Sequence, residues 1–218
     1  MMTFLRRSVL ATIVMLVSMD PVRAASLDAE LLDIQRAWAE INYSATSAEQ
    51  KAADFGQLAN KARALVASHS GRAEPMVWHG IVLSSQAGAK GGLGALSLAK
   101  QARSVLEGSL KIDPAALAGS AHTSLGTLYH KVPGFPVGFG DDKKARTHLE
   151  TALKLNPAGI DPNFFYAEFL IDEGETALAI KHLRIAQAAP PRIGRETADA
   201  GRRQEIAALL GEAGLAPR

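Results

Sequence analysis

Apolar residues recur at helical spacing along most of this chain, and short stretches rich in proline, glycine or polar residues separate the apolar segments. Residues 27–43 and 47–69, for example, are apolar on one face only, which is typical of helices packed against a core. No segment alternates apolar and polar residues in the manner of a convincing strand. The pattern predicts one all-α domain of about nine helices, arranged as an α-solenoid with no sheet.

Two segments of thirteen residues are close copies of one another. Residues 102–114 read ARSVLEGSLKIDP, residues 145–157 read ARTHLETALKLNP, and seven of the thirteen positions are identical. A third, fainter copy follows 34 residues after the second, with Ala179, Leu183, Ala186 and Pro191. In each copy the small and apolar residues share one helix face, and a proline ends the helix.

A further apolar segment precedes each copy and carries a small residue near its middle. These residues are Gly80, Gly126 and Ala167, and a larger apolar residue follows each of them three positions later. A small residue lets a neighbouring helix approach closely, and the larger residue fills the space beside it. The repeats are therefore expected to be pairs of tightly packed helices.

The combined pattern, L-G-x2-Y followed by A-x3-L, A and P with a 34-residue period, resembles the tetratricopeptide repeat. The resemblance covers about residues 74–191 and implies stacked helix pairs whose first helices line a concave groove. Ser47 and Gln50 form a capping-box pattern at the start of a helix before the repeats. The predicted order is a degenerate helix pair, three repeats and a capping helix, at residues 28–70, 74–114, 115–157, 161–191 and 195–214.

Two glycine-rich insertions interrupt the repeats at the same point. The small residue of the first helix lies 12 residues before the first alanine of the second helix in the third copy. The same span is 19 residues from Gly126 to Ala145 and 22 residues from Gly80 to Ala102. Stacked repeats place equivalent loops side by side, so we expect the two insertions to form one continuous surface.

The second insertion, KVPGFPVGFGDD, has the composition of a phosphate-binding loop but not its pattern. The Walker spacing is absent, and we expect Asp141 or Asp142 to cap the helix start that a phosphate would need. Phe135 and Phe139 remain as candidate binding residues. They either fold inward onto the adjacent helices or form an exposed apolar patch.

The N-terminus has the organisation of a secretory signal peptide at residues 1–24. Arg6 and Arg7 precede a largely apolar run, and the small residues Val22 and Ala24 occupy the positions that signal peptidase reads. The run is too short to span a bilayer. We expect cleavage after Ala24 and a periplasmic protein that meets the membrane only during export.

Charge and composition narrow the functional classes. The chain carries 24 basic and 22 acidic residues, and because residues 1–24 hold three arginines and one aspartate, residues 25–218 carry 21 of each. This balance gives no electrostatic footprint for nucleic acid. The absence of cysteine excludes disulfides, thiolate catalysis and cysteine-ligated metals.

Other reactive side chains show no arrangement typical of an enzyme. His79, His122 and His130 fall in the first helices of repeats, but no metal-binding spacing occurs. We therefore predict no catalytic residue, no metal and no cofactor. The arginine-rich segment 192–203 also contains acidic residues, and is interpreted as a solvated face or as a site for an acidic partner.

Residues 125–170 also resemble a stretch found in secreted bacterial tetratricopeptide proteins, and their organisation is similar to the TatT component family of TRAP-type transporters. That resemblance implies a helical protein working with a periplasmic solute-binding protein. Two functions follow: a scaffold that binds a protein or peptide, or a TatT-like accessory that binds a solute-binding subunit or a small apolar ligand. The candidate groove residues are Trp78, His79, His122, Tyr129, Phe165 and Tyr166.

Overall fold

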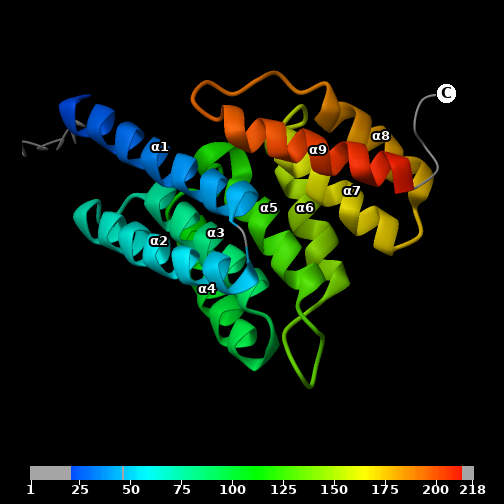
Figure 1. The fold of residues 1–218 in the computed structure, drawn as a ribbon, viewed down its shortest axis with the longest axis horizontal. Helices are drawn as coiled ribbons and strands as arrows, with labels where there is room; N and C mark the ends of the chain where they lie inside the picture. Colours follow the sequence, from blue (N-terminus) through cyan, green and yellow to red (C-terminus); the bar gives the residue numbers. More distant parts are fainter. Residues whose placement is uncertain (1–20, 46, 213–218) are drawn as a thin grey trace, which may run out of the picture.

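The computed structural model describes residues 21–45 and 47–212, which form nine α-helices and no strand (Figure 1). The all-α solenoid predicted from the sequence is confirmed. The helices are α1 (Pro21–Ser44), α2 (Ala48–Ser68), α3 (Ala73–Lys90), α4 (Gly92–Ile112), α5 (Ala116–Lys131), α6 (Asp142–Leu155), α7 (Ile160–Asp172), α8 (Thr176–Gln187) and α9 (Glu196–Glu212).

Consecutive helices pack as hairpins, and the hairpins stack through their first members. Helices α3 and α4, α5 and α6, and α7 and α8 make extensive paired contacts, while α3 packs on α5 and α5 packs on α7. The helices that begin each pair therefore form an inner layer, and α4, α6 and α8 form an outer one. The three pairs span residues 73–112, 116–155 and 160–187, against expected repeat segments of 74–114, 115–157 and 161–191.

Small residues in the inner helices permit close approach to the outer helices. A methyl group on Gly80 would lie 2.5 Å from Leu106 Cγ, and one on Gly126 would lie 2.6 Å from Leu149 Cγ. Leu106 and Leu149 occupy equivalent repeat positions and are completely buried, as is Leu183 in the third pair. The packing expected from the small residues is confirmed.

Side-chain caps begin two of the helices where the sequence predicts them. Ser47 Oγ accepts a hydrogen bond from the backbone amide of Gln50 at 3.1 Å, which caps α2. Asp141 Oδ1 accepts one from the amide of Lys144 at 3.1 Å, which caps α6. Of the two aspartates that end the glycine-rich stretch, Asp141 is the cap, and Asp142 is the first helical residue.

The first insertion is not a loop, which corrects the expectation of two equivalent loops. Helix α3 continues to Lys90 and α4 begins at Gly92, so the additional residues lengthen both helices. A single residue, Gly91, makes the connection with φ +62°, a left-handed conformation that favours glycine. Glycines thus shorten this turn to one residue.

The second insertion is a compact loop between α5 and α6 that projects from the body of the molecule (Figure 1). Its two sides approach so closely that a side chain on Gly140 would collide with the carbonyl oxygen of Val132, and one on Gly138 with that of Pro133. The amide of Gly140 donates to Pro133 O at 3.0 Å. The glycines serve this backbone contact rather than anion binding.

The first and last helices meet, a contact that the repeat pattern does not predict. Helix α9 packs against α1 as well as α7 and α8 (Figure 1). Arg36 Nε donates to Gly194 O at 3.2 Å, and Thr197 Oγ1 donates to Glu40 Oε1 at 3.3 Å. We call this contact between α1 and the chain from Gly194 to the end of α9 the seam. It joins the two ends of the solenoid.

Residues 1–20, most of the predicted signal peptide, lie outside the described residues. Helix α1 begins at Pro21 and continues past Ala24, and cleavage there stays a prediction. Within residues 21–45 and 47–212 no helix combines the length and apolar character needed to cross a membrane.

We predict that Gly126→Ala lowers the free energy of unfolding by about 1–2 kcal/mol, because overpacking against Leu149 outweighs the helix propensity of alanine. The matched change Gly88→Ala, where nothing lies within 4 Å of the new methyl group, is expected to raise it by up to about 1 kcal/mol. Urea denaturation measures both. Equal effects of the two changes would contradict the packing account.

Candidate binding groove

A groove of about 1270 Å³ opens on the concave side of the inner helices. Helices α3, α5 and α7 supply most of its wall, and α1, α9 and the α8–α9 connection contribute residues near the seam. Both glycine-rich insertions reach it, through Gly88, Gly92, Ala95 and Leu96 on one side and Val132, Pro133 and Val137 on the other. The two segments thus line one common surface.

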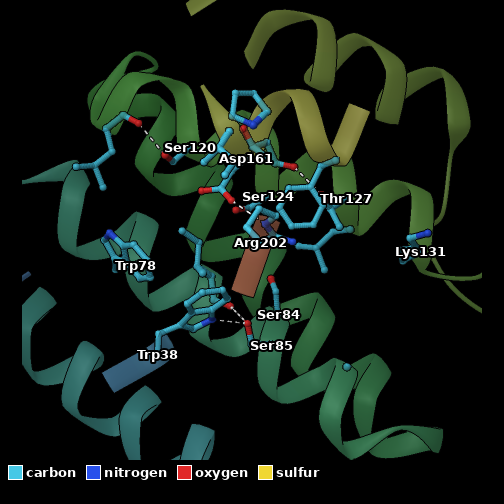
Figure 2. A pocket seen from close by; sticks show the side chains of 18 of the residues that line it. Trp38, Trp78, Ser84, Ser85, Ser120, Ser124, Thr127, Lys131, Asp161 and Arg202 are labelled. Atoms are coloured by element: carbon cyan, nitrogen blue, oxygen red, sulfur yellow. Dashed lines mark hydrogen bonds and ion pairs between the residues drawn. The ribbon is translucent and has the colours of Figure 1, made fainter. Parts of the chain in front are cut away.

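Aromatic and aliphatic side chains make up one part of the wall. Trp38 of α1 and Trp78 of α3 meet edge to face, with ring centroids 6.3 Å apart (Figure 2). Trp38 Nε1 donates to Ser85 Oγ at 2.8 Å, which fixes the indole and satisfies its only donor. Such rings offer a large apolar contact area at a small cost in side-chain entropy.

Hydroxyl groups follow the inner helices along the groove. Ser84, Ser120 and Thr127 each donate to a backbone carbonyl of their own helix, at 2.8, 2.7 and 3.0 Å. Figure 2 shows these residues around the pocket together with Ser124. Because their protons are already donated, the hydroxyl oxygens are left with lone pairs that accept hydrogen bonds from a ligand.

A partly buried ion network lies near α7 and α9. Asp161 accepts from Arg192 Nη1 at 2.6 Å and from Arg202 Nε at 3.1 Å. Arg192 also binds Asp199, and Arg202 binds Glu205 at 2.6 Å. Burial alone would raise the pKa of Asp161, but the charges of Arg202 and Arg192 outweigh it and hold this pKa at about 2.

Arg195 lies beside this network without a carboxylate partner among the described residues. Its Nη1 donates to Gln35 Oε1 at 3.2 Å, and its guanidinium lies 5.1 Å from the ring centroid of Trp78. Its Nε is buried and has no hydrogen-bond acceptor in the described part of the chain. Burial and the neighbouring charge of Arg192 lower the pKa of Arg195 to about 10.

Of the six candidate residues in the inner helices, Trp78 and Phe165 line the groove. Tyr129 and Tyr166 turn the other way, toward the preceding outer helix, and donate to the equivalent residues Glu107 and Glu150 at 3.2 and 3.4 Å. Both side chains therefore lie in the contact between neighbouring repeats, and the expectation that they face the groove is corrected.

The histidine candidates also lie outside the groove lining. Burial lowers the pKa of half-buried His79. His122 Nδ1 lies 2.9 Å from His148 Nδ1, and burial lowers the pKa of both rings. The His122 ring therefore packs against α6 rather than facing the concave side.

The two phenylalanines of the α5–α6 loop have different environments. Phe135 is 93% exposed at the loop. Phe139 packs edge to face on Tyr129, with ring centroids 5.7 Å apart, and the Arg103 guanidinium lies 4.3 Å from its ring centroid. One residue thus faces solvent and the other anchors the loop to the core.

Several groove residues were not singled out by sequence reasoning as lining it. Trp38 belongs to the degenerate helix pair, outside the repeats that carry the recognised pattern. Arg192, Arg195 and Arg202 belong to the arginine-rich segment that the sequence indicates. Their place in the groove depends on the seam, because Arg195 and Gln35 are 160 residues apart in the chain. The alternation of arginine with acidic residues over 192–205 is the one local signal of an ion network.

In the described part of the chain, no group of three or more histidine, aspartate or glutamate side chains is placed to hold a metal ion. His130, a candidate by sequence, instead has its Nε2 2.8 Å from Asp172 Oδ2. The described lining of the groove offers apolar surfaces and hydroxyl oxygens.

Asp161→Asn should lower the free energy of unfolding at pH 7 by about 3 kcal/mol, because it leaves two arginines without their shared counter-ion. Since the folded pKa of Asp161 is held at about 2 and its unfolded value is about 3.9, its stabilisation is complete above pH ~4. It is lost as pH falls toward 2, where wild type and variant should converge. Denaturant unfolding from pH 7 to pH 2 measures this, with exposed Asp33→Asn as control. A constant difference between wild type and Asp161→Asn at every pH would refute the assignment.

Comparison with known proteins supports the fold. No protein-family model and no curated protein matches the chain. A solved structure of a thermophilic TPR protein from Thermus thermophilus matches with a TM-score of 0.55 and 19% sequence identity. The match covers 87% of this chain and 94% of that chain. At this identity the likeness concerns the fold alone, and the chain has a tetratricopeptide-like fold of stacked helix pairs.

Proposed function

We propose that this protein is a non-catalytic binding protein that holds a segment of a partner protein in its groove. The observation that carries the proposal is the groove itself, about 1270 Å³ on the concave side of a tetratricopeptide-like solenoid. Pockets for small molecules generally have about 300–1000 Å³. A groove that exceeds this range and is open along one side suits a peptide segment.

The lining has the two kinds of contact that a peptide requires. Trp38, Trp78 and Phe165 offer apolar area to side chains. The hydroxyl oxygens of Ser84, Ser120 and Thr127 accept hydrogen bonds, as backbone amides of a bound segment require. Apolar contacts alone would leave those amides unsatisfied on entering the groove, which costs binding free energy.

The same proposal places the protein outside the cytoplasm. Its support is the sequence of residues 1–24, with two arginines before an apolar run and small residues at the cleavage position. The protein recovered from a periplasmic fraction is expected to have the intact mass of a chain that begins at Ala25. A full-length chain confined to the cytoplasm would contradict this location.

A second candidate is a TatT-like accessory role in a TRAP-type transport system. The seam favours it, because joining the ends of the solenoid encloses the groove more than an open superhelix does, as a small apolar ligand would need. Purification from periplasmic extract separates the two candidates. Recovery of a solute-binding protein in a stoichiometric complex supports the transport role, and its absence supports the peptide-binding one.

Filling the groove tests the peptide-binding proposal. Ser124 lines the groove, and Ser124→Trp places a large ring there without replacing a core residue. A library of short random-sequence peptides is passed over immobilised protein, and affinities of retained peptides are measured by fluorescence polarisation. We expect Ser124→Trp to raise their Kd at least tenfold.

The matched control is Ser104→Trp on the exposed face of α4, away from the groove, which should leave the Kd unchanged. Equal retention of peptides by wild type and Ser124→Trp would show that the groove is not the peptide-binding site. Thermal unfolding of all three proteins verifies that each is folded.

A further inference from the structure

We propose that the contact between His122 and His148 makes the pairing of α5 with α6 sensitive to pH, and that acid conditions release the α5–α6 loop from the core. We call these two residues the histidine pair. Both side chains are half-buried between the two helices. Such a response is independent of what the groove binds, and it therefore goes beyond the proposed function.

The two rings of the histidine pair face each other through the same ring nitrogen. His122 Nδ1 lies 2.9 Å from His148 Nδ1, and the ring centroids are 5.1 Å apart. A neutral imidazole has one N–H and one bare nitrogen, so one Nδ1 donates a hydrogen bond and the other accepts it. Once both rings are protonated, both Nδ1 atoms carry hydrogen, no acceptor remains, and two positive charges meet. The contact therefore tolerates one added proton but not two.

The equivalent contact in the third repeat lacks this restriction. Asn163 and His182 occupy the repeat positions of His122 and His148, and His182 Nδ1 lies 2.8 Å from Asn163 Oδ1. Asn163 Nδ2 donates to two backbone carbonyl oxygens just before α7, at 2.9 Å each, which fixes Oδ1 as the acceptor. His182 Nδ1 is then the donor, and the ring takes up a proton on Nε2 without losing this bond.

Charged groups around the histidine pair do not reverse its reluctance to be protonated. Burial lowers the pKa of both members, and the charge of the partner ring lowers that of His148 further. Glu107 of α4 raises the pKa of His148 and Lys144 of α6 lowers it, both with smaller effect than burial. Glu107 also accepts from Tyr129 at 3.2 Å and lies 3.6 Å from Arg103. Within the described residues, α3 and α7 place no charged group that shifts the pKa of either ring.

The direction of the pH effect follows from these lowered pKa values. An exposed histidine in the unfolded chain has a pKa of about 6.5. Because the folded pKa values of the histidine pair lie below this, the unfolded segment binds more protons than the folded one as the pH falls. The stabilisation from this contact is therefore complete above pH ~6.5 and is lost as the pH falls through the folded pKa values.

The ring of His148 connects the histidine pair to the loop. It stacks on Tyr129, with ring centroids 5.7 Å apart and planes 10° from parallel, and Phe139 of the loop packs on the same tyrosine. The backbone amide of Asp141, at the end of the loop, donates to Tyr129 O at 2.9 Å. Displacement of His148 thus loosens the residue that holds both loop anchors. Because residues 132, 133 and 137 of this loop line the groove, its release changes the groove rim.

Hydrogen exchange of single amides, followed by NMR on the whole protein, tests this response. The amide of Asp141 reports on the loop, and the amide of Glu175, which donates to Leu170 O at 2.8 Å in the α7–α8 turn, is the internal control. From about pH 7.5 to about pH 5.5 we expect the protection factor of Asp141 to fall about tenfold, after correction for the chemical exchange rate. The protection factor of Glu175 should change less than about twofold.

Two variants remove the histidine pair in different ways. His122→Asn reproduces the pairing of the third repeat, and His148→Phe keeps a ring on Tyr129 without a titrating nitrogen. Both are expected to abolish the pH-dependent fall at Asp141. The control His79→Gln removes a half-buried histidine of α3 whose pKa is also lowered by burial, and it should leave the fall unchanged.

Three results would overturn the proposal. Protection of Asp141 that stays constant with pH in the wild type would show that the loop does not respond to protons. Equal falls at Asp141 and Glu175 would mean that acid loosens the whole solenoid rather than this contact. A fall that persists in either His122→Asn or His148→Phe would assign the response to a group other than the histidine pair.

Discussion

The contact between the first and last helices decides what this solenoid is able to do. A stack of helix pairs curves but has two free ends, and its concave face is normally an open surface. Here α9 turns back onto α1, and the hydrogen bonds from Arg36 to Gly194 and from Thr197 to Glu40 join the ends. Both ends of the solenoid thereby line the concave face, and Gln35 and Arg195, 160 positions apart in the chain, belong to one site.

The three arginines near the seam differ in their ion pairs. Asp161 draws Arg192 and Arg202 together and keeps its charge at neutral pH, because their charges outweigh the burial that would raise its pKa. The same burial leaves Arg195 with a lowered pKa and no carboxylate partner among the described residues. Buried ion networks contribute little net stability unless every charge is matched. The three carboxylates Asp161, Asp199 and Glu205 equal the three arginines in number, and they contact Arg192 and Arg202 directly.

Much of the fold was predictable from the sequence, because helical periodicity and small residues act locally. Gly126 indicated a close helix contact, and Asp141 a helix cap, and both occur. Periodicity shows which residues share a helix face but not which neighbour covers that face, so Tyr129 was assigned to the groove although it packs on α4. The seam left no local signal, since Arg195 meets Gln35 only after the whole stack has formed.

Closure of the solenoid is the claim on which this account depends, and the absence of cysteine makes it directly measurable. Cysteines at positions 40 and 197, whose native side chains lie 3.3 Å apart across the seam, would be the only thiols in the protein. A short bismaleimide should join them rapidly within the monomer in native buffer, and far more slowly in denaturant. Native protein that reacts at both thiols without forming the intramolecular link would show that the ends stay apart in solution, and the seam would have to be abandoned.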